Sequence, residues 1–134
     1  MRALLDLVLI DLYECEHETL LNQDEIKGKM LEAARLMGAQ VVAVSFYTFA
    51  PFGVSGTITV AESHLAVHTW PEHDYAAITF ETCGADMDLA KACHFLVTAF
   101  GSKRPVITPQ KRGFINADIL VQPVKQGGDI LCPP

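Results

Sequence analysis

The sequence predicts a single α+β domain, a two-layer sandwich in which a largely antiparallel sheet carries two helices on one face. Three observations support this prediction. The chain has 134 residues, of which 50% are hydrophobic and 19% charged, which suits one domain with its own core. Strand-like segments follow one another directly in the middle of the chain, which favours antiparallel pairing. Two segments repeat apolar residues at helical spacing, enough to cover one face of such a sheet.

The strands are predicted from runs of β-branched and aromatic residues that turn residues separate. The N-terminal run over residues 3–13 is expected to form a buried strand. Further strands are expected over residues 40–49, 54–61, 64–70 and 75–82, with two short candidates at 106–108 and 119–121. We expect one domain over residues 1–124 and a loose tail over residues 125–134.

The two helices are predicted from their caps and from their apolar faces. The first begins after Asn22, and Glu25 follows three residues later as in a capping box. It ends before Gly38, because glycine readily adopts the left-handed conformation that stops a helix. The second is expected to begin at an Asp86 cap and to end at Gly101. Its apolar face is formed by Leu89, Cys93, Leu96 and Phe100.

Charge and hydropathy argue against two classes of partner. The net charge is −6, whereas nucleic-acid binding requires clustered Lys and Arg. The first apolar run is too short to span a membrane, contains Asp6 and Asp11, and has no small-residue cleavage site. We therefore expect a cytoplasmic protein that binds neither nucleic acid nor membrane. Its four cysteines form no CxxC pair, which argues against disulfides in a reducing compartment.

Reactive side chains are concentrated between Gly53 and Gly84, and the strand pattern limits what they can do. His64 and His68 would share a zinc ion on a helix, but on a strand they lie about 13 Å apart. We therefore expect no metal site. Ser63 and His68 lie about 16 Å apart on an extended chain, which argues against a Ser-His hydrolase pair. From these residues alone, a β-hairpin with solvated polar side chains is the simplest interpretation.

Five motifs in this segment change that interpretation. They are Gly-Val-Ser-Gly at 53–56, Ala-Glu-Ser-His at 61–64, His-Thr-Trp-Pro-Glu at 68–72, Tyr-Ala-Ala at 75–77 and Thr-Cys-Gly at 82–84. In this order and spacing they resemble the core of the prokaryotic S-adenosylmethionine decarboxylase proenzymes. Tyr-Glu-Cys at 13–15 and the flanking helices are also similar to that family. The resemblance therefore covers most of residues 7–113.

The resemblance implies that the chain cuts its own backbone between Glu62 and Ser63. The Ser63 hydroxyl would attack the Glu62 carbonyl, and elimination from the resulting ester would leave fragments 1–62 and 63–134. The second fragment would begin with a pyruvoyl cofactor derived from Ser63. Ser55 would stabilise the oxyanion, and His68 would accept the Ser63 α-proton. The pyruvoyl group would form a Schiff base with the substrate amine, and Cys83 would reprotonate the carbanion left by CO2.

The family also implies a substrate, S-adenosylmethionine, whose decarboxylated product donates aminopropyl groups in spermidine synthesis. Phe49 would stack on the adenine and Glu72 would bind the ribose. Leu65 and Trp70 complete the substrate-binding set that we expect from the resemblance.

The spacing along the strand adds an expectation about assembly. Because His68 is too far from Ser63 within one chain, His68 should come from a second copy. This agrees with the family, whose sites lie at a homodimer interface. We expect Ser63 and Cys83 from one protomer, and Ser55 and His68 from its partner. Further pairing of the processed αβ pairs is left open.

Three departures from the family pattern leave alternatives for the substrate. The family usually has Gly-Arg-His where this chain has Leu5-Asp6-Leu7, His at the position of Tyr47, and Tyr-Gly at the position of His73-Asp74. Asp74 adds a carboxylate that could hold a terminal ammonium or guanidinium group. The first alternative is therefore the same chemistry on ornithine or arginine. The second is an inactive binding subunit, against which the intact Glu62-Ser63 pair argues.

Overall fold

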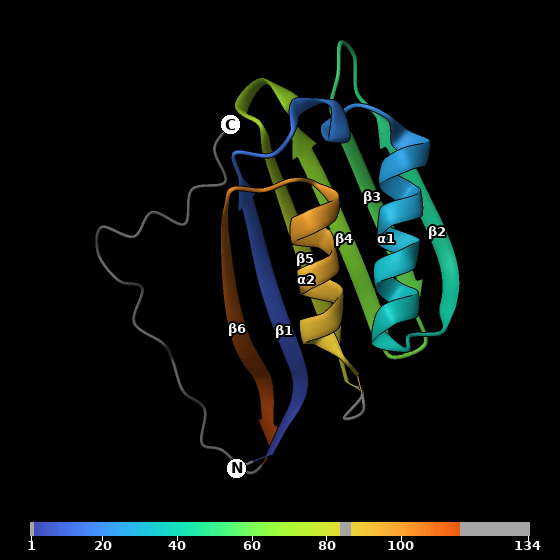
Figure 1. The fold of residues 1–134 in the computed structure, drawn as a ribbon. Helices are drawn as coiled ribbons and strands as arrows, with labels where there is room; N and C mark the ends of the chain where they lie inside the picture. Colours follow the sequence, from blue (N-terminus) through green and yellow to red (C-terminus); the bar gives the residue numbers. More distant parts are fainter. Residues whose placement is uncertain (1, 84–86, 116–134) are drawn as a thin grey trace, which may run out of the picture.

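The computed structural model describes residues 2–83 and 87–115. Six strands form one antiparallel sheet in the order β2-β3-β4-β5-β1-β6. Figure 1 shows both helices lying on the same face of this sheet, which confirms the predicted two-layer α+β sandwich. The strands are β1 Arg2–Tyr13, β2 Val41–Thr48, β3 Val54–Val60, β4 Ser63–Trp70, β5 Tyr75–Thr82 and β6 Arg104–Ile115. The predicted strand at 119–121 and the tail at 125–134 lie outside the described residues.

The two helices begin at polar caps. Helix α1, Gln23–Met37, follows Asn22, whose side chain accepts a hydrogen bond from the Glu25 backbone N–H as predicted. Gly38 ends α1 with φ 83°. Helix α2, Leu89–Ala99, is capped by Asp88 and not by Asp86, because the Asp88 carboxylate accepts from the backbone N–H of Lys91. The prediction of an Asp86 cap was wrong by two residues, since either aspartate suits a cap position in the sequence.

The last strand is much longer than predicted. Strand β6 pairs with β1 along its whole length, from Arg104 opposite Tyr13 to Ile115 opposite Arg2. Pro105 in this segment and the proline four residues after it limited the prediction to residues 106–108. An edge strand tolerates proline, because one side of its ladder is unpaired and the missing N–H need not be used there.

The core lies between the sheet and the helices. Side chains alternate along each strand, so that every second one faces the helices. Fully buried side chains from both layers meet there, among them Leu12, Ile26, Met30, Ile58, Leu65, Ile78, Phe80, Leu96 and Phe100. On the opposite face of the sheet, strand β4 presents His64, Ala66, His68 and Trp70. Neither described helix covers this side of the sheet, which we call the open face (Figure 1), and most of the reactive side chains lie on it.

Two short 3-10 turns were not predicted. Turn η1, His17–Leu20, follows β1, and turn η2, Pro71–His73, connects β4 to β5. They lie side by side at one end of the sheet, because the backbone N–H of Cys15 donates to the carbonyl of Asp74 at 2.9 Å.

Candidate active site

The turn between β3 and β4 contains the predicted scissile bond. The carbonyl oxygen of Glu62 accepts two hydrogen bonds from Cys83, one from its backbone N–H at 3.0 Å and one from its thiol at 2.9 Å. Cys83 is in place because Ser63 pairs with Thr82 across the β4–β5 ladder. Two donors on one carbonyl oxygen polarise that carbonyl and stabilise the oxyanion that forms when its carbon is attacked.

Ser63 occupies strained backbone. Its φ is 156°, a positive value that residues other than glycine rarely adopt. Backbone of this kind stores on the order of 1–3 kcal/mol. Two buried oxygens on either side of Ser63, Glu62 Oε2 and Thr82 Oγ1, have no hydrogen-bond partner among the described residues. Strain and unpaired polar atoms therefore coincide at the bond that was predicted to break.

A second polar cluster lies at the other end of the same strands. Ser55 on β3 and His68 on β4 are directly paired, and their side chains hydrogen-bond with 2.7 Å between Oγ and Nδ1. The Trp70 ring lies beside His68 on the open face, with 6.1 Å between ring centroids. These residues are neighbours of one another, but they are not neighbours of Ser63.

One chain therefore does not bring Ser63 and His68 together. Both lie on β4, where Ser63 pairs with Val60 and His68 pairs with Ser55. They are five positions apart on the strand, which corresponds to about 16 Å. A strand paired on both sides cannot fold back to shorten this distance. The single chain therefore holds two separate clusters, one with Ser63 and Cys83 and one with Ser55 and His68, and we call each of them a half-site.

A small pocket adjoins the second cluster. It has a volume of about 250 Å³ and is lined by Phe49, Phe52, Gly53, Ser55, Thr69, Trp70 and Glu72. Three of the predicted substrate-binding residues, Phe49, Trp70 and Glu72, are therefore together in it. The sequence analysis missed Phe52, because a residue after Pro51 in a turn carries no signal of a binding role. Tyr47, one of the departures from the family, packs edge-on against Phe49 with 4.9 Å between centroids.

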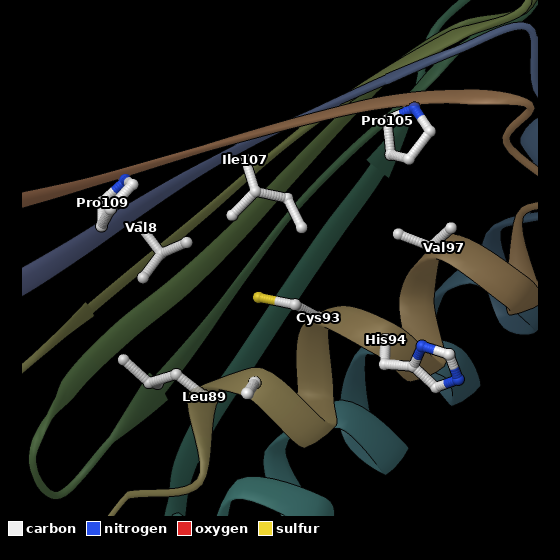
Figure 2. A pocket seen from close by; sticks show the side chains of 9 residues that line it. Val8, Leu89, Cys93, His94, Val97, Pro105, Ile107 and Pro109 are labelled. Atoms are coloured by element: carbon white, nitrogen blue, oxygen red, sulfur yellow. The ribbon is translucent and has the colours of Figure 1, made fainter.

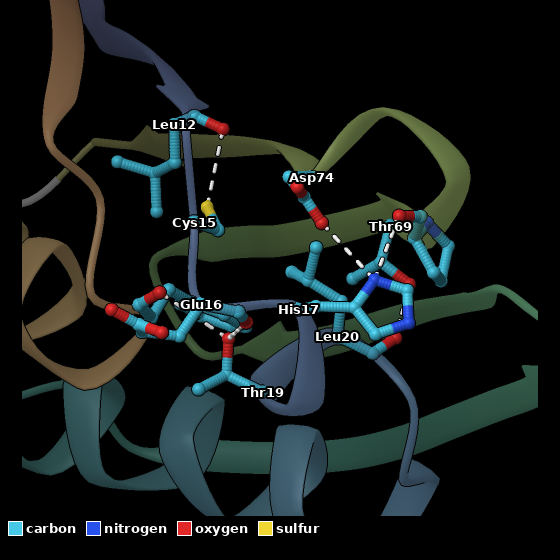
Figure 3. Close-up of polar contacts among 10 residues, drawn as sticks. Leu12, Cys15, Glu16, His17, Thr19, Leu20, Thr69 and Asp74 are labelled. Atoms are coloured by element: carbon cyan, nitrogen blue, oxygen red, sulfur yellow. Dashed lines mark hydrogen bonds and ion pairs between the residues drawn. The ribbon is translucent and has the colours of Figure 1, made fainter.

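Two predicted substrate-binding residues lie elsewhere. Leu65 is completely buried on the helix side of β4, so it offers no surface to a substrate. Asp74 is at the end of η2, and its Oδ1 lies 3.1 Å from Nδ1 of His17 (Figure 3). The same ring nitrogen lies 3.1 Å from the carbonyl oxygen of Pro71, so it carries a proton and donates to both. In this chain the Asp74 carboxylate connects η2 to η1 and does not line the pocket.

A further cavity is apolar and remote from both clusters. Figure 2 shows it between α2 and β6, with Val8, Leu89, Val97 and Ile107 pointing into it. Its volume is about 600 Å³, and none of the predicted site residues lines it. Burial raises the pKa of Cys93, which also lines it, to about 11. That thiol stays protonated at neutral pH and is a poor nucleophile.

Comparison with known proteins shows to which family the chain is similar. The family described as S-adenosylmethionine decarboxylase matches residues 6–113. A protein of Acidithiobacillus ferrooxidans named S-adenosylmethionine decarboxylase proenzyme is 42% identical over 116 residues, 87% of each chain. One of the same name from Thermotoga maritima is 42% identical over 113 residues, 84% of this chain and 87% of its own.

A solved structure of the same family is also similar to this chain. The adenosylmethionine decarboxylase of Aquifex aeolicus superposes with a TM-score of 0.80 and 26% identity, covering 90% of this chain and 100% of its own. All three relatives are decarboxylases by name. The chain belongs to the S-adenosylmethionine decarboxylase family. In the described part of the chain, neither helix has the length and hydrophobicity needed to cross a bilayer.

Proposed function

We propose that this chain is a proenzyme that cuts itself between Glu62 and Ser63 and then decarboxylates S-adenosylmethionine. One observation supports the cut most directly. The Glu62 carbonyl oxygen accepts two hydrogen bonds from Cys83, and the neighbouring Ser63 carries a hydroxyl next to that peptide bond. The name proenzyme in the relatives agrees with self-processing.

The cut follows from ordinary acyl-transfer chemistry. Ser63 Oγ adds to the Glu62 carbonyl carbon, and loss of the Ser63 nitrogen from that carbon converts the peptide to an ester. The Cys83 donors stabilise the oxyanion between these steps. Removal of the Ser63 α-proton then expels the Glu62 carboxylate, and hydrolysis of the remaining enamine releases ammonia. The pyruvoyl group left on residue 63 supplies an electron sink for decarboxylation.

The α-proton requires a base, and we assign it to His68 of a second copy. Within one chain His68 is too far from Ser63, although it is fixed by Ser55 at 2.7 Å. The open face suits a face-to-face homodimer, because it carries large exposed apolar side chains. Trp70, Val106 and Phe114 are each at least 40% exposed there. A partner chain on this face would bring its own half-site to Ser63 and Cys83.

The pocket suits a nucleoside better than a short amino acid. Phe49 and Trp70 give it exposed aromatic surfaces for an adenine, and Glu72 offers a carboxylate that accepts from ribose hydroxyls. The alternative substrates, ornithine and arginine, depend on Asp74. Since that carboxylate contacts His17 and lies outside the pocket, we keep S-adenosylmethionine as the substrate. We expect the enzyme to act in the cytoplasm.

Two measurements test the proposal. Intact mass should show fragments 1–62 and 63–134, with the second lacking a free amine, while Ser63→Ala stays one chain. Release of labelled CO2 from carboxyl-labelled S-adenosylmethionine, ornithine and arginine should occur with the first only. An uncut wild type that is active would overturn the self-processing mechanism. Release from ornithine or arginine alone would overturn the substrate.

A further inference from the structure

His64 lies beside the scissile bond and is not used by the mechanism above. We propose that His64 is the base that takes the Ser63 hydroxyl proton when the ester forms, and that Glu81 and Arg112 position it. This inference rests on the proposed self-cleavage. It assigns the first step to a histidine of the same chain, and leaves the second step to His68.

Three consecutive contacts carry the inference. Nδ1 of His64 lies 3.3 Å from Oγ of Ser63. On the other side of the ring, Nε2 of His64 lies 3.4 Å from Oε2 of Glu81. The other oxygen of Glu81 accepts from Nη1 of Arg112 at 3.0 Å. Hydroxyl, imidazole, carboxylate and guanidinium thus form a line that starts at the attacking atom.

The sheet holds this line in place. His64 and Glu81 are directly paired on β4 and β5, so their side chains are neighbours on the open face. Arg112 reaches them from β6 across β1, where Leu7 pairs with Glu81 and Leu5 pairs with Arg112. The Glu81 side chain is 13% exposed, and Arg112 balances its charge. A carboxylate that is both shielded and paired is a fixed acceptor for the ring.

The acceptor fixes which nitrogen of the neutral ring carries the proton. A carboxylate can only accept, so in the proposed arrangement the neutral ring of His64 carries its proton on Nε2, 3.4 Å from Glu81, and Nδ1 would present its lone pair to Ser63. A carboxylate that aligns a histidine in this way also stabilises the imidazolium that forms when the ring takes a proton. His68 of the same chain cannot take the Ser63 proton, because its Nδ1 contacts Ser55 at the far end of the strand.

The step balances without any further reactant. As Oγ of Ser63 bonds to the Glu62 carbonyl carbon, its proton moves to Nδ1 of His64. As the bond between that carbon and the Ser63 nitrogen breaks, the imidazolium returns the proton to the nitrogen, which leaves as an amine. The peptide is isomerised to an ester and His64 is regenerated, so the reaction needs only this chain.

The test separates ester formation from elimination. In His68→Ala, processing should stop once the ester has formed, because elimination is blocked. Hydroxylamine cuts esters under conditions that leave peptide bonds intact. In that background we expect His64→Ala to slow the appearance of hydroxylamine-released fragments by about a hundredfold, the lower range for a lost acid-base group. Added imidazole should restore part of the rate. His94→Ala on the exposed side of α2 is the matched control and should leave the rate unchanged.

Two conservative variants distinguish a base from a residue that only positions Ser63. His64→Asn keeps an acceptor near Nδ1 but cannot hold a proton, so it should be as slow as His64→Ala. Glu81→Gln keeps an acceptor for the ring but not the charge, and should give an intermediate rate. Normal ester formation in folded His64→Ala, or recovery in His64→Asn, would overturn the assignment. If the wild type does not cut itself and hydroxylamine does not cut His68→Ala, the proposed self-cleavage itself fails.

Discussion

Two defective chains should repair each other if the site is shared between protomers. Ser63→Ala removes the proposed attacking hydroxyl, and His68→Ala removes the proposed base for elimination. Each variant alone should yield no pyruvoyl fragment. In a heterodimer, the Ser63 of the His68→Ala chain meets the intact His68 of its partner. We therefore expect cutting on co-expression, and only of the His68→Ala chain.

The magnitude follows from the geometry and from random pairing. Ser63 and His68 are five residues apart on β4, about 16 Å along a strand that is held on both sides. Contact between them within one chain is therefore excluded. With equal amounts of the two chains, about half of the dimers are heterodimers, and each has one competent site. About half of the His68→Ala chains should be cut, which is about a quarter of all chains.

Mass spectrometry of purified dimers measures this fraction. Different affinity tags on the two chains allow heterodimers to be isolated, and in these the His68→Ala chain should be cut completely. Because an ester can hydrolyse, the pyruvoyl group and not merely a cut must be found on residue 63. Isolated heterodimers without this fragment would refute the shared site. Cutting of His68→Ala homodimers to the pyruvoyl form would refute the role of His68.

Three further outcomes are expected. Cys83→Ala removes one of two hydrogen bonds to the Glu62 carbonyl, about 0.5–1.5 kcal/mol, so cutting should slow only about two- to tenfold on a gel time course. CO2 release by the cut Cys83→Ala enzyme should fall about a hundredfold or more, because the proposed proton donor is lost. Asp74→Asn should leave the rate of S-adenosylmethionine decarboxylation within a few-fold of wild type, since Asp74 does not line the pocket. A ten- to hundredfold lower rate would show that Asp74 contributes to the active site. Gly56→Ala should lower the free energy of unfolding in urea by about 1–3 kcal/mol, because the new Cβ would lie 2.0 Å from the ring of Phe46; unchanged stability would mean that the ring moves aside.

Local signals were sufficient to predict most of the fold. The caps at Asn22 and Gly38 are specified by the residues themselves, and the strand at 75–82 is exact. The length of β6 was not predictable locally, because its prolines are permitted only by its place at the sheet edge. That place depends on pairing with β1, more than ninety residues earlier in the chain. A pattern read along the chain does not report such a partner.

Most residues of the candidate site could be named from the sequence, but most contacts between them could not. Once the turn between Trp70 and Tyr75 is fixed, each residue before it pairs with one equally far after it, which places Cys83 opposite Glu62. The predicted role of Cys83 rested on the family resemblance alone. The contact of Arg112 with Glu81 is different, because it crosses an intervening strand and depends on the order of the whole sheet.

If the active site is shared between protomers, the placement of His64 and His68 makes pyruvoyl formation depend on dimer formation. His64 reaches Ser63 within one chain, so an isolated protomer would be able to form the ester and return it to the peptide. In the proposed dimer His68 would reach Ser63 only from the partner, so the irreversible elimination would wait for dimer formation. The pyruvoyl group would then form only in a dimer, where a complete pocket surrounds it. A monomer would not carry the reactive ketone. Diluting newly folded protein below its dimer dissociation constant should therefore stop pyruvoyl formation while hydroxylamine sensitivity persists. Pyruvoyl formation at a rate independent of protein concentration would show that one chain suffices.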